Sequence, residues 1–182
     1  MSYENTTWGK HRTASLPALN NRYRLTKLRE FLGVTHLSGK TLDIGAENFI
    51  GKSLGITDNT MGDLNYELNA PQELYDTILC LEVINHLFNS GILLDNIKMH
   101  LSRGGRLYIS TPRLWGIVIP HGRGNFMELI HRNMKELLEY KGFKILRHKT
   151  YRSYPLRFFF YGFRPMIKVW LHRYTIFECE LA

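Results

Sequence analysis

Apolar residues along this chain follow two alternating patterns. Short, nearly continuous apolar runs, typical of buried strands, occupy residues 41–44, 54–57, 76–81, 107–110, 143–148 and 174–181. Apolar residues recur at helical spacing, as on one face of a helix, at residues 19–32, 47–54, 92–101 and 126–140. Strands that alternate with helices predict a single α/β domain with a mostly parallel sheet.

The first expected strand ends in an Asp-Ile-Gly turn that leads directly into a helix. Gly45 lacks a Cβ, so the backbone there can approach a ligand closely. Asp43 lies at the carboxyl end of the strand, where open α/β sheets bind their ligands. A strand that breaks at a glycine and feeds a helix is the first unit of a nucleotide-binding α/β fold. We therefore expect Asp43 and Gly45 to belong to a ligand site.

Two later segments support this prediction by their order along the chain. Residues 75–87 combine a continuous apolar strand with Glu82 and His86 just after it. Residues 102–112 combine a Gly-Gly turn, a short strand and a final Pro112. Together with the Asp-Ile-Gly turn, these segments resemble the class I S-adenosylmethionine-dependent methyltransferases. The resemblance covers residues 40–146, with a closing strand near the C-terminus.

The resemblance implies a Rossmann-like methyltransferase fold. Its sheet would be mostly parallel, with an antiparallel C-terminal hairpin and a shortened segment between the family's first and fourth strands. The implied cofactor is S-adenosylmethionine, and the implied reaction is methyl transfer to an oxygen or nitrogen of an unidentified small-molecule or lipid-linked substrate. The implied cofactor-binding residues are Asp43, Gly45, Asp63, Leu64, Leu81, Glu82 and Val83.

Asp63 is the candidate for binding the ribose of the cofactor. An acidic residue about 20 positions after the glycine turn commonly receives the ribose hydroxyls in such folds. One carboxylate can accept from two vicinal hydroxyls, which is why an acid suits this position. Asp58 is the alternative, and either residue can instead be an ordinary turn aspartate.

The glycine turn departs from the family pattern, which has two further glycines at alternate positions. Glu47 and Phe49 stand there in this chain, and Gly51 lies at a different offset. In the family, these further glycines let the methionine half of the cofactor lie on bare backbone, and this chain lacks them. A non-catalytic interaction module with this fold is therefore an alternative function.

His86 is the candidate general base. Glu82 and His86 are four positions apart, so in a helix they would share a face. A histidine changes charge near neutral pH and can take a proton from a substrate hydroxyl; structural packing is the alternative role. Some related enzymes bind a metal with two glutamates and a histidine here. Asn85 replaces the second glutamate, so we expect no metal.

Length and composition fit one domain of an ordinary protein. The chain has 182 residues, of which 44% are hydrophobic and 22% charged. Cys80 and Cys179 lie in apolar segments, which predicts buried thiols in a reducing compartment. We find no secretory signal and no apolar stretch long enough to span a membrane, so a cytoplasmic location is expected. Residues 1–17 are expected to form a flexible arm.

The net charge of +8 favours an anionic partner. Residues 151–173 interleave aromatic and basic side chains and are longer than a hairpin needs, so we read them as an insertion that is helical after Pro165. This composition predicts docking on an anionic membrane surface, ahead of nucleic acid, although an RNA-directed methyltransferase is an alternative. A buried lid or dimer face is a further alternative. The basic residues of the first helix are expected to form a solvated face: Arg22, Arg24, Lys27 and Arg29.

Overall fold

The computed structural model describes residues 15–45, 48–60, 63–68, 70–114 and 131–182. The helices are α1 (Ser15–Leu32), α2 (Phe49–Leu54), α3 (Ser90–His100), α4 (His131–Tyr140) and α5 (Phe163–Leu171), with the 3-10 helices η1 (Ile84–His86) and η2 (Leu156–Tyr161). The strands are β1 (Thr41–Asp43), β2 (Asp58–Asn59), β3 (Tyr75–Leu81), β4 (Leu101–Leu114), β5 (Phe143–Arg152) and β6 (His172–Leu181).

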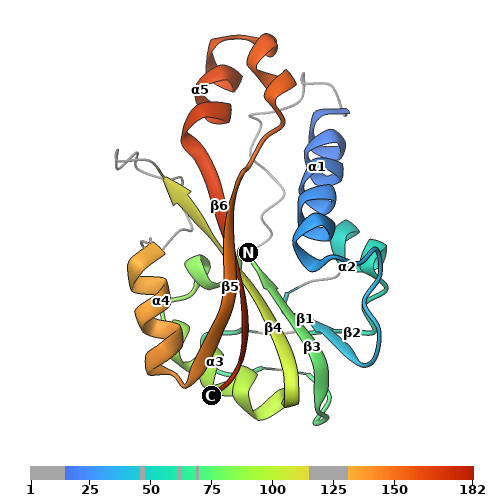
Figure 1. The fold of residues 1–182 in the computed structure, drawn as a ribbon, viewed down its shortest axis with the longest axis vertical. Helices are drawn as coiled ribbons and strands as arrows, with labels where there is room; N and C mark the ends of the chain where they lie inside the picture. The colour runs from blue at the N-terminus through green and yellow to red at the C-terminus, as the bar shows by residue number, and fades with distance from the viewer. Residues whose placement is uncertain (1–14, 46–47, 61–62, 69, 115–130) are drawn as a thin grey trace.

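These strands form one sheet in the order β2-β1-β3-β4-β6-β5 (Figure 1). Neighbours among β2, β1, β3 and β4 are parallel, whereas β6 runs antiparallel to both β4 and β5. The mostly parallel sheet with an antiparallel C-terminal hairpin is as predicted. The shortened segment is confirmed too, because the described residues between β1 and β3 form only the short helix α2 and the two-residue β2. We call the edge where β1, β3 and β4 end the carboxyl edge.

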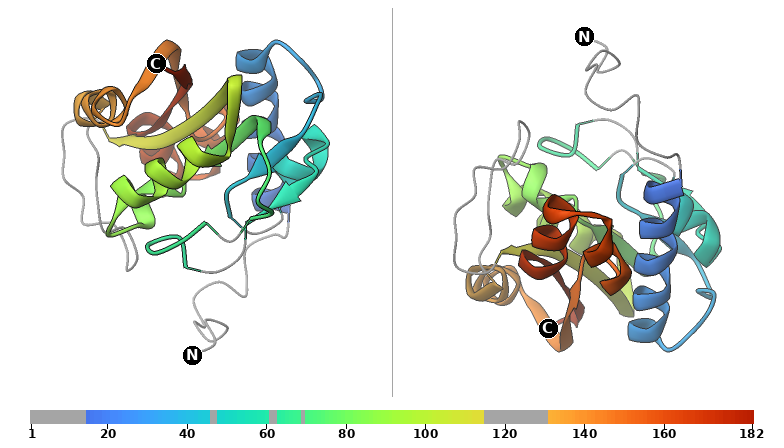
Figure 2. Two further views of the ribbon diagram at one scale, coloured as in Figure 1. Left: turned by 90° about the horizontal axis from the view of Figure 1, so that it is seen from below. Right: turned by 90° about the horizontal axis from the view of Figure 1, so that it is seen from above.

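Side chains alternate between the two faces of the sheet along each strand, and each face packs against its own set of helices. Ile78 and Cys80 of β3 belong to one apolar cluster with α3 and α4, whereas Leu79 belongs to a second cluster with α1 and α2. The helices therefore cover both faces of the sheet (Figure 2). Cys80 and Cys179 are buried free thiols, as expected.

Several predicted strand limits were wrong. Strand β4 begins at Leu101 and not at residue 107, and β5 continues to Arg152 and does not end at residue 148. The second strand lies at Asp58–Asn59 rather than at residues 54–57, because Gly55, at φ 75°, ends α2 as its C-cap. Pro112 does not end its strand, which continues to Leu114. Pairing of β3 with β4 stops at Ser110, so Pro112 has a strand neighbour only on the β6 side and its missing N–H breaks no ladder with β3.

The Gly104-Gly105 turn also has a different role from the predicted one. It does not end the preceding helix, because α3 ends at His100 and β4 begins at the next residue. The glycines lie instead where the register between β3 and β4 shifts, and Gly104 adopts φ 75° there.

Near the N-terminus, α1 begins at Ser15, so the last residues of the predicted arm are helical.

The insertion predicted at residues 151–173 is shorter in the structure, because β5 continues to Arg152 and β6 begins at His172. It consists of η2 and α5, so helical structure begins before Pro165 and not after it. We call residues 153–171 the aromatic lobe. His172 pairs with Leu114 and Arg152 pairs with Arg173, so the lobe begins at the carboxyl edge. Figure 1 shows it standing beyond the end of the sheet where β4 finishes. Residues 126–130 of the predicted fourth helix lie outside the described residues.

Candidate active site

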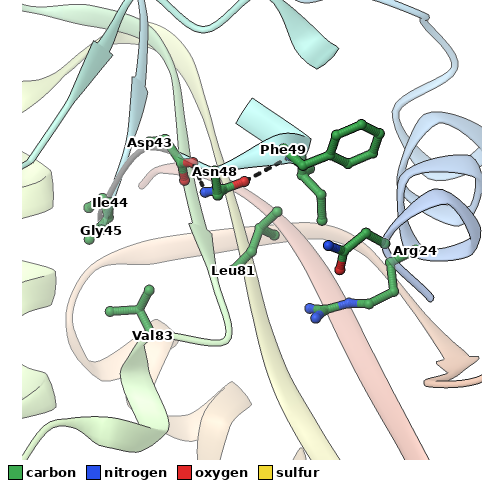
Figure 3. Close-up of a pocket in the computed structure, with 10 residues that line it drawn as sticks. Arg24, Asp43, Ile44, Gly45, Asn48, Phe49, Leu81 and Val83 are labelled. Carbon is green, nitrogen blue, oxygen red and sulfur yellow. Dashed lines mark hydrogen bonds between the residues drawn. The ribbon is translucent and has the colours of Figure 1, made fainter. Parts of the chain in front are cut away.

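A pocket of about 240 Å³ opens at the carboxyl ends of β1 and β3 (Figure 3). Its walls come from four parts of the chain: the middle of α1, the end of β1 with its glycine turn, the start of α2, and the residues around the end of β3. The lining residues are Asn21, Arg24, Asp43, Ile44, Gly45, Asn48, Phe49, Ile50, Leu81 and Val83. Asp43, Gly45, Leu81 and Val83 were among the candidates from sequence.

Gly45 forms the floor of the pocket with a conformation that other residues rarely adopt. Its φ is 122°, and its N–H donates to Thr60 Oγ1 at 2.8 Å. That bond fixes the glycine turn to the end of β2. A Cβ at this position would meet Val83 Cγ2 at 3.7 Å, an ordinary contact, so the positive φ and not a lack of space favours glycine here.

Asp43 brings a buried carboxyl group to the wall of the pocket. The residue is 3% exposed, and burial raises the pKa of its carboxyl to about 6. The side chain of Asn48 opposes this rise by donating from Nδ2 to Asp43 Oδ2 at 2.7 Å. Gly51 allows α2 to approach, because a Cβ there would lie 2.9 Å from Asp43 Oδ2.

Asn48 also starts α2. Its Oδ1 accepts from the N–H groups of Ile50 and Gly51 at 2.9 and 3.0 Å, which is the N-cap arrangement. One amide therefore caps the helix with its oxygen and solvates Asp43 with its nitrogen. Phe49 follows at the first position of the helix, and its side chain lines the pocket.

Arg24 supplies a cation to a different wall of the pocket, on α1 (Figure 3). Its Nη2 lies 3.1 Å from Glu82 Oε1, and its guanidinium carbon lies 5.7 Å from the centre of the Tyr174 ring. The prediction that the basic residues of this helix form a solvated face was therefore wrong for Arg24. Its position over the site follows from the packing of α1 across the sheet.

Glu82 has an unusual backbone at the carboxyl end of β3. Its φ is 58°, and its N–H donates to Ser110 Oγ at 3.0 Å. The chain then forms η1, so Glu82 precedes the helix, and the prediction that Glu82 and His86 share one helical face was wrong. His86 is exposed, and its Nε2 lies 3.3 Å from the side-chain nitrogen of Asn85. Glu82 and His86 do not line the pocket.

Comparison with known structures identifies the architecture around this pocket. A glycopeptide N-methyltransferase, MtfA, complexed with S-adenosylmethionine superposes with a TM-score of 0.58 and 15% identity, over 87% of this chain and 94% of the other. An O-methyltransferase from a multienzyme of Brevibacillus brevis, in complex with S-adenosylhomocysteine, superposes with a TM-score of 0.59 and 15% identity, over 91% and 72%. The chain has the fold of the class I methyltransferases.

The same fold also occurs in a protein whose name states a different activity. The [4+2]-cyclase SpnF superposes with a TM-score of 0.57 and 14% identity, over 87% of this chain and 80% of the other. Neither a protein-family model nor a curated protein sequence matches this chain. The methyltransferase fold is therefore established by structure, and the activity has to be argued from the site.

In this methyltransferase fold, the candidate ribose acids lie away from the pocket wall. Asp63 is on an exposed turn, where its Oδ1 accepts from the backbone and side-chain nitrogens of Asn65; these bonds lower the pKa of the Asp63 carboxyl. Asp58 Oδ2 accepts from Thr57 Oγ1 at 3.1 Å. Leu64 packs against the core beside α3. The cofactor role of Asp63 and Leu64 stays a prediction.

The structure brings forward a residue that the sequence reasoning missed. Asn59 pairs with Asp43 in the parallel register of β1 and β2, so the two side chains lie on the same side of the sheet at its carboxyl edge. Like Asp58 and Asp63, Asn59 does not line the pocket. Counting positions from the glycine turn could not find Asn59, because the expected residue type was an acid.

The described part of the chain contains no group of three or more His, Cys, Asp or Glu side chains that could hold a metal ion. None of its helices is long and apolar enough to cross a membrane.

Proposed function

We propose that this chain binds S-adenosylmethionine in the pocket beside Gly45 and transfers the methyl group to an oxygen or nitrogen of an unidentified acceptor. One observation carries the proposal. A buried carboxyl group and a guanidinium line one pocket at the glycine turn of a methyltransferase fold.

The charged groups of the pocket suit the amino-acid end of this cofactor. That end carries an ammonium and a carboxylate. Asp43 can accept from the ammonium, and Arg24 has further N–H donors for the carboxylate besides the one near Glu82. The bare backbone of Gly45 allows both groups to come close to the chain.

Phe49 is the feature that fits least well. It stands where the family pattern has glycine, and it is one of the residues that line the pocket. The volume of about 240 Å³ lies below the roughly 300–1,000 Å³ of typical ligand sites. The Phe49 side chain is 45% exposed, so it has room to turn outward when a ligand enters.

The bound cofactor would supply an electrophilic methyl group on its sulfonium. The chain would hold the acceptor in line with that methyl group and exclude water from it. Asp43 and Arg24 would fix the cofactor, while Leu81 and Val83 offer apolar surface at the end of β3. His86 is the proposed base for the acceptor proton, and it follows β3 at the same edge of the sheet.

Calorimetric titration with S-adenosylmethionine and S-adenosylhomocysteine tests the proposal. We expect saturable binding to the wild type, and weakening by about 1.5–3 kcal/mol in Arg24→Gln, since a hydrogen bond to a charged group is lost. Asp63→Ala serves as a second probe, because it changes an acid outside the pocket wall. Equal loss in Asp63→Ala would assign the ribose to that residue. No heat at millimolar ligand would refute the proposal.

The second candidate function is a non-catalytic interaction module. Glu47 and Phe49, in place of glycines, are the observation that favours it. An RNA-directed methyltransferase is a narrower form of the main proposal, motivated by the charge of +8. Cofactor binding without any effect of RNA would argue against that form, and absence of cofactor binding would leave the interaction module.

A further inference from the structure

The aromatic lobe leaves an unusual amount of apolar side chain in contact with solvent. Phe160 is 87% exposed, Phe163 72% and Trp170 71%, and Leu156 and Phe159 of η2 are exposed as well. Large apolar side chains gathered on one surface mark a site of interaction with a partner or a membrane.

This exposure does not result from a poorly packed lobe. Phe158 and Val169 are buried within it, and Pro155 is buried at its base. The Tyr154 and Phe158 rings lie 5.8 Å apart. The lobe therefore has its own small core, and the exposed rings are additional to that core.

The charge of the segment indicates what covers these rings. The lobe, residues 153–171, contains three Arg or Lys residues and no Asp or Glu: Arg157, Arg164 and Lys168. A second copy of the chain would bring two surfaces of the same charge together, which opposes self-association. A partner that is apolar inside and anionic at its surface matches both features. An anionic lipid bilayer has this arrangement.

We propose that the aromatic lobe docks on anionic membranes by inserting Phe160, Phe163 and Trp170 among the headgroups. Aromatic side chains favour the interfacial region of a bilayer, and the basic residues then meet lipid phosphates. This inference does not depend on methyl transfer.

The aromatic lobe and the pocket are linked by contacts between neighbouring residues. Tyr154, at the base of the lobe, is half-buried, and burial together with the nearby Glu82 carboxylate raises the pKa of its hydroxyl. Glu82 in turn contacts Arg24 of the pocket wall. The lobe and the pocket thus share the carboxyl edge of the sheet.

Vesicle co-sedimentation of the full chain tests the proposal. We expect pelleting with vesicles that contain phosphatidylglycerol, little pelleting with pure phosphatidylcholine, and release by salt. Phe160→Ala/Trp170→Ala should weaken vesicle affinity about tenfold or more, because two large apolar side chains no longer leave water. Arg157→Gln should weaken it about fivefold. The matched control, Tyr66→Ala/Tyr140→Ala, removes two equally exposed rings elsewhere and should change nothing.

A second readout keeps the proposal falsifiable if a lobe variant misfolds. In Trp8→Phe/Trp115→Phe protein, Trp170 is the remaining tryptophan, and its emission should shift to the blue with anionic vesicles. An unchanged emission, or equal recovery in the supernatant with both lipids, would overturn the proposal. A dimer that Phe160→Ala/Trp170→Ala dissociates, or tighter binding to single-stranded RNA than to vesicles, would also overturn it.

Discussion

Asn48 Nδ2 lies 2.7 Å from Asp43 Oδ2, while Asn48 Oδ1 caps the first turn of α2. The residue that starts the helix therefore also stabilises the buried carboxylate at the pocket wall. Gly51 makes this contact feasible, since any side chain there would press on Asp43. The end of β1 and the start of α2 are consequently one unit, and changes in either should appear in the titration of Asp43.

We expect Asn48→Ala to lose both functions of the amide. The lost cap and hydrogen bond should lower the free energy of unfolding by about 1–2 kcal/mol, and the pKa of Asp43 should rise further above 6. Asn48→Asp is the matched variant, because it keeps a good cap but places a second carboxylate against Asp43. Chemical denaturation and carboxyl NMR titration measure the two effects. An unchanged Asp43 pKa in both variants would contradict the assignment.

Asp43 should make the folded state less stable as pH rises. Its folded pKa of about 6 exceeds its ordinary value of 3.8, so between these values the folded chain retains a proton that the unfolded chain has lost. Its contribution is fully present below pH 3.8 and is lost as pH rises to 6. Asp43→Asn should therefore be more stable than wild type at pH 7, by up to about 3 kcal/mol. Denaturation curves at several pH values give the difference in the free energy of unfolding between the two proteins. A difference that does not change with pH would contradict this prediction.

Glu82 should behave as a strained residue. Its φ of 58° costs a non-glycine residue about 1–2 kcal/mol. Both Glu82→Gly and Glu82→Ala lose the contact with Arg24, so their difference isolates the backbone. We expect the glycine variant to be the more stable by about 1 kcal/mol, opposite to the usual cost of glycine. If urea denaturation ranks alanine above glycine, the backbone at this position is not strained.

Phe49→Gly should enlarge the pocket and restore the family pattern at that position. We expect tighter binding of S-adenosylhomocysteine by calorimetry, together with a loss of up to about 1 kcal/mol of stability from glycine in α2. Phe88→Ala removes an exposed ring outside the pocket and serves as the control. Weaker binding in Phe49→Gly would show that the ring contacts the ligand rather than restricting it.

Most of the fold could be predicted because its signals are local. The run from Ile78 to Cys80 alternates between two apolar clusters, and that burial on both faces is what a continuous apolar strand predicts. The limits of β2 and β4 could not be predicted, because they depend on neighbours. The strand β2 has only two residues, which is too short to show an alternating pattern. In β4, Pro112 is tolerated because the pairing with β3 has already ended at Ser110.

The lining of the candidate pocket could be predicted only in part. Asp43 and Gly45 were found because a strand-glycine-helix turn requires them. Arg24 was missed because its charge pattern on α1 resembles a solvated face, and its position over the pocket depends on tertiary packing. Asn48 was missed because its two bonds depend on the angle between β1 and α2. The wrong prediction for Glu82 arose because helical spacing cannot show a positive φ.

The most direct test is an NMR titration of the isotopically labelled chain with S-adenosylhomocysteine. Cofactor binding beside Gly45 predicts saturable shifts in the amides that line the pocket, Gly45, Asn48, Phe49 and Val83, with α4 and the aromatic lobe unchanged. Arg24→Gln should shift the same amides at higher ligand concentration. No shift at millimolar ligand, or shifts confined to residues outside the pocket, would contradict the proposed cofactor site.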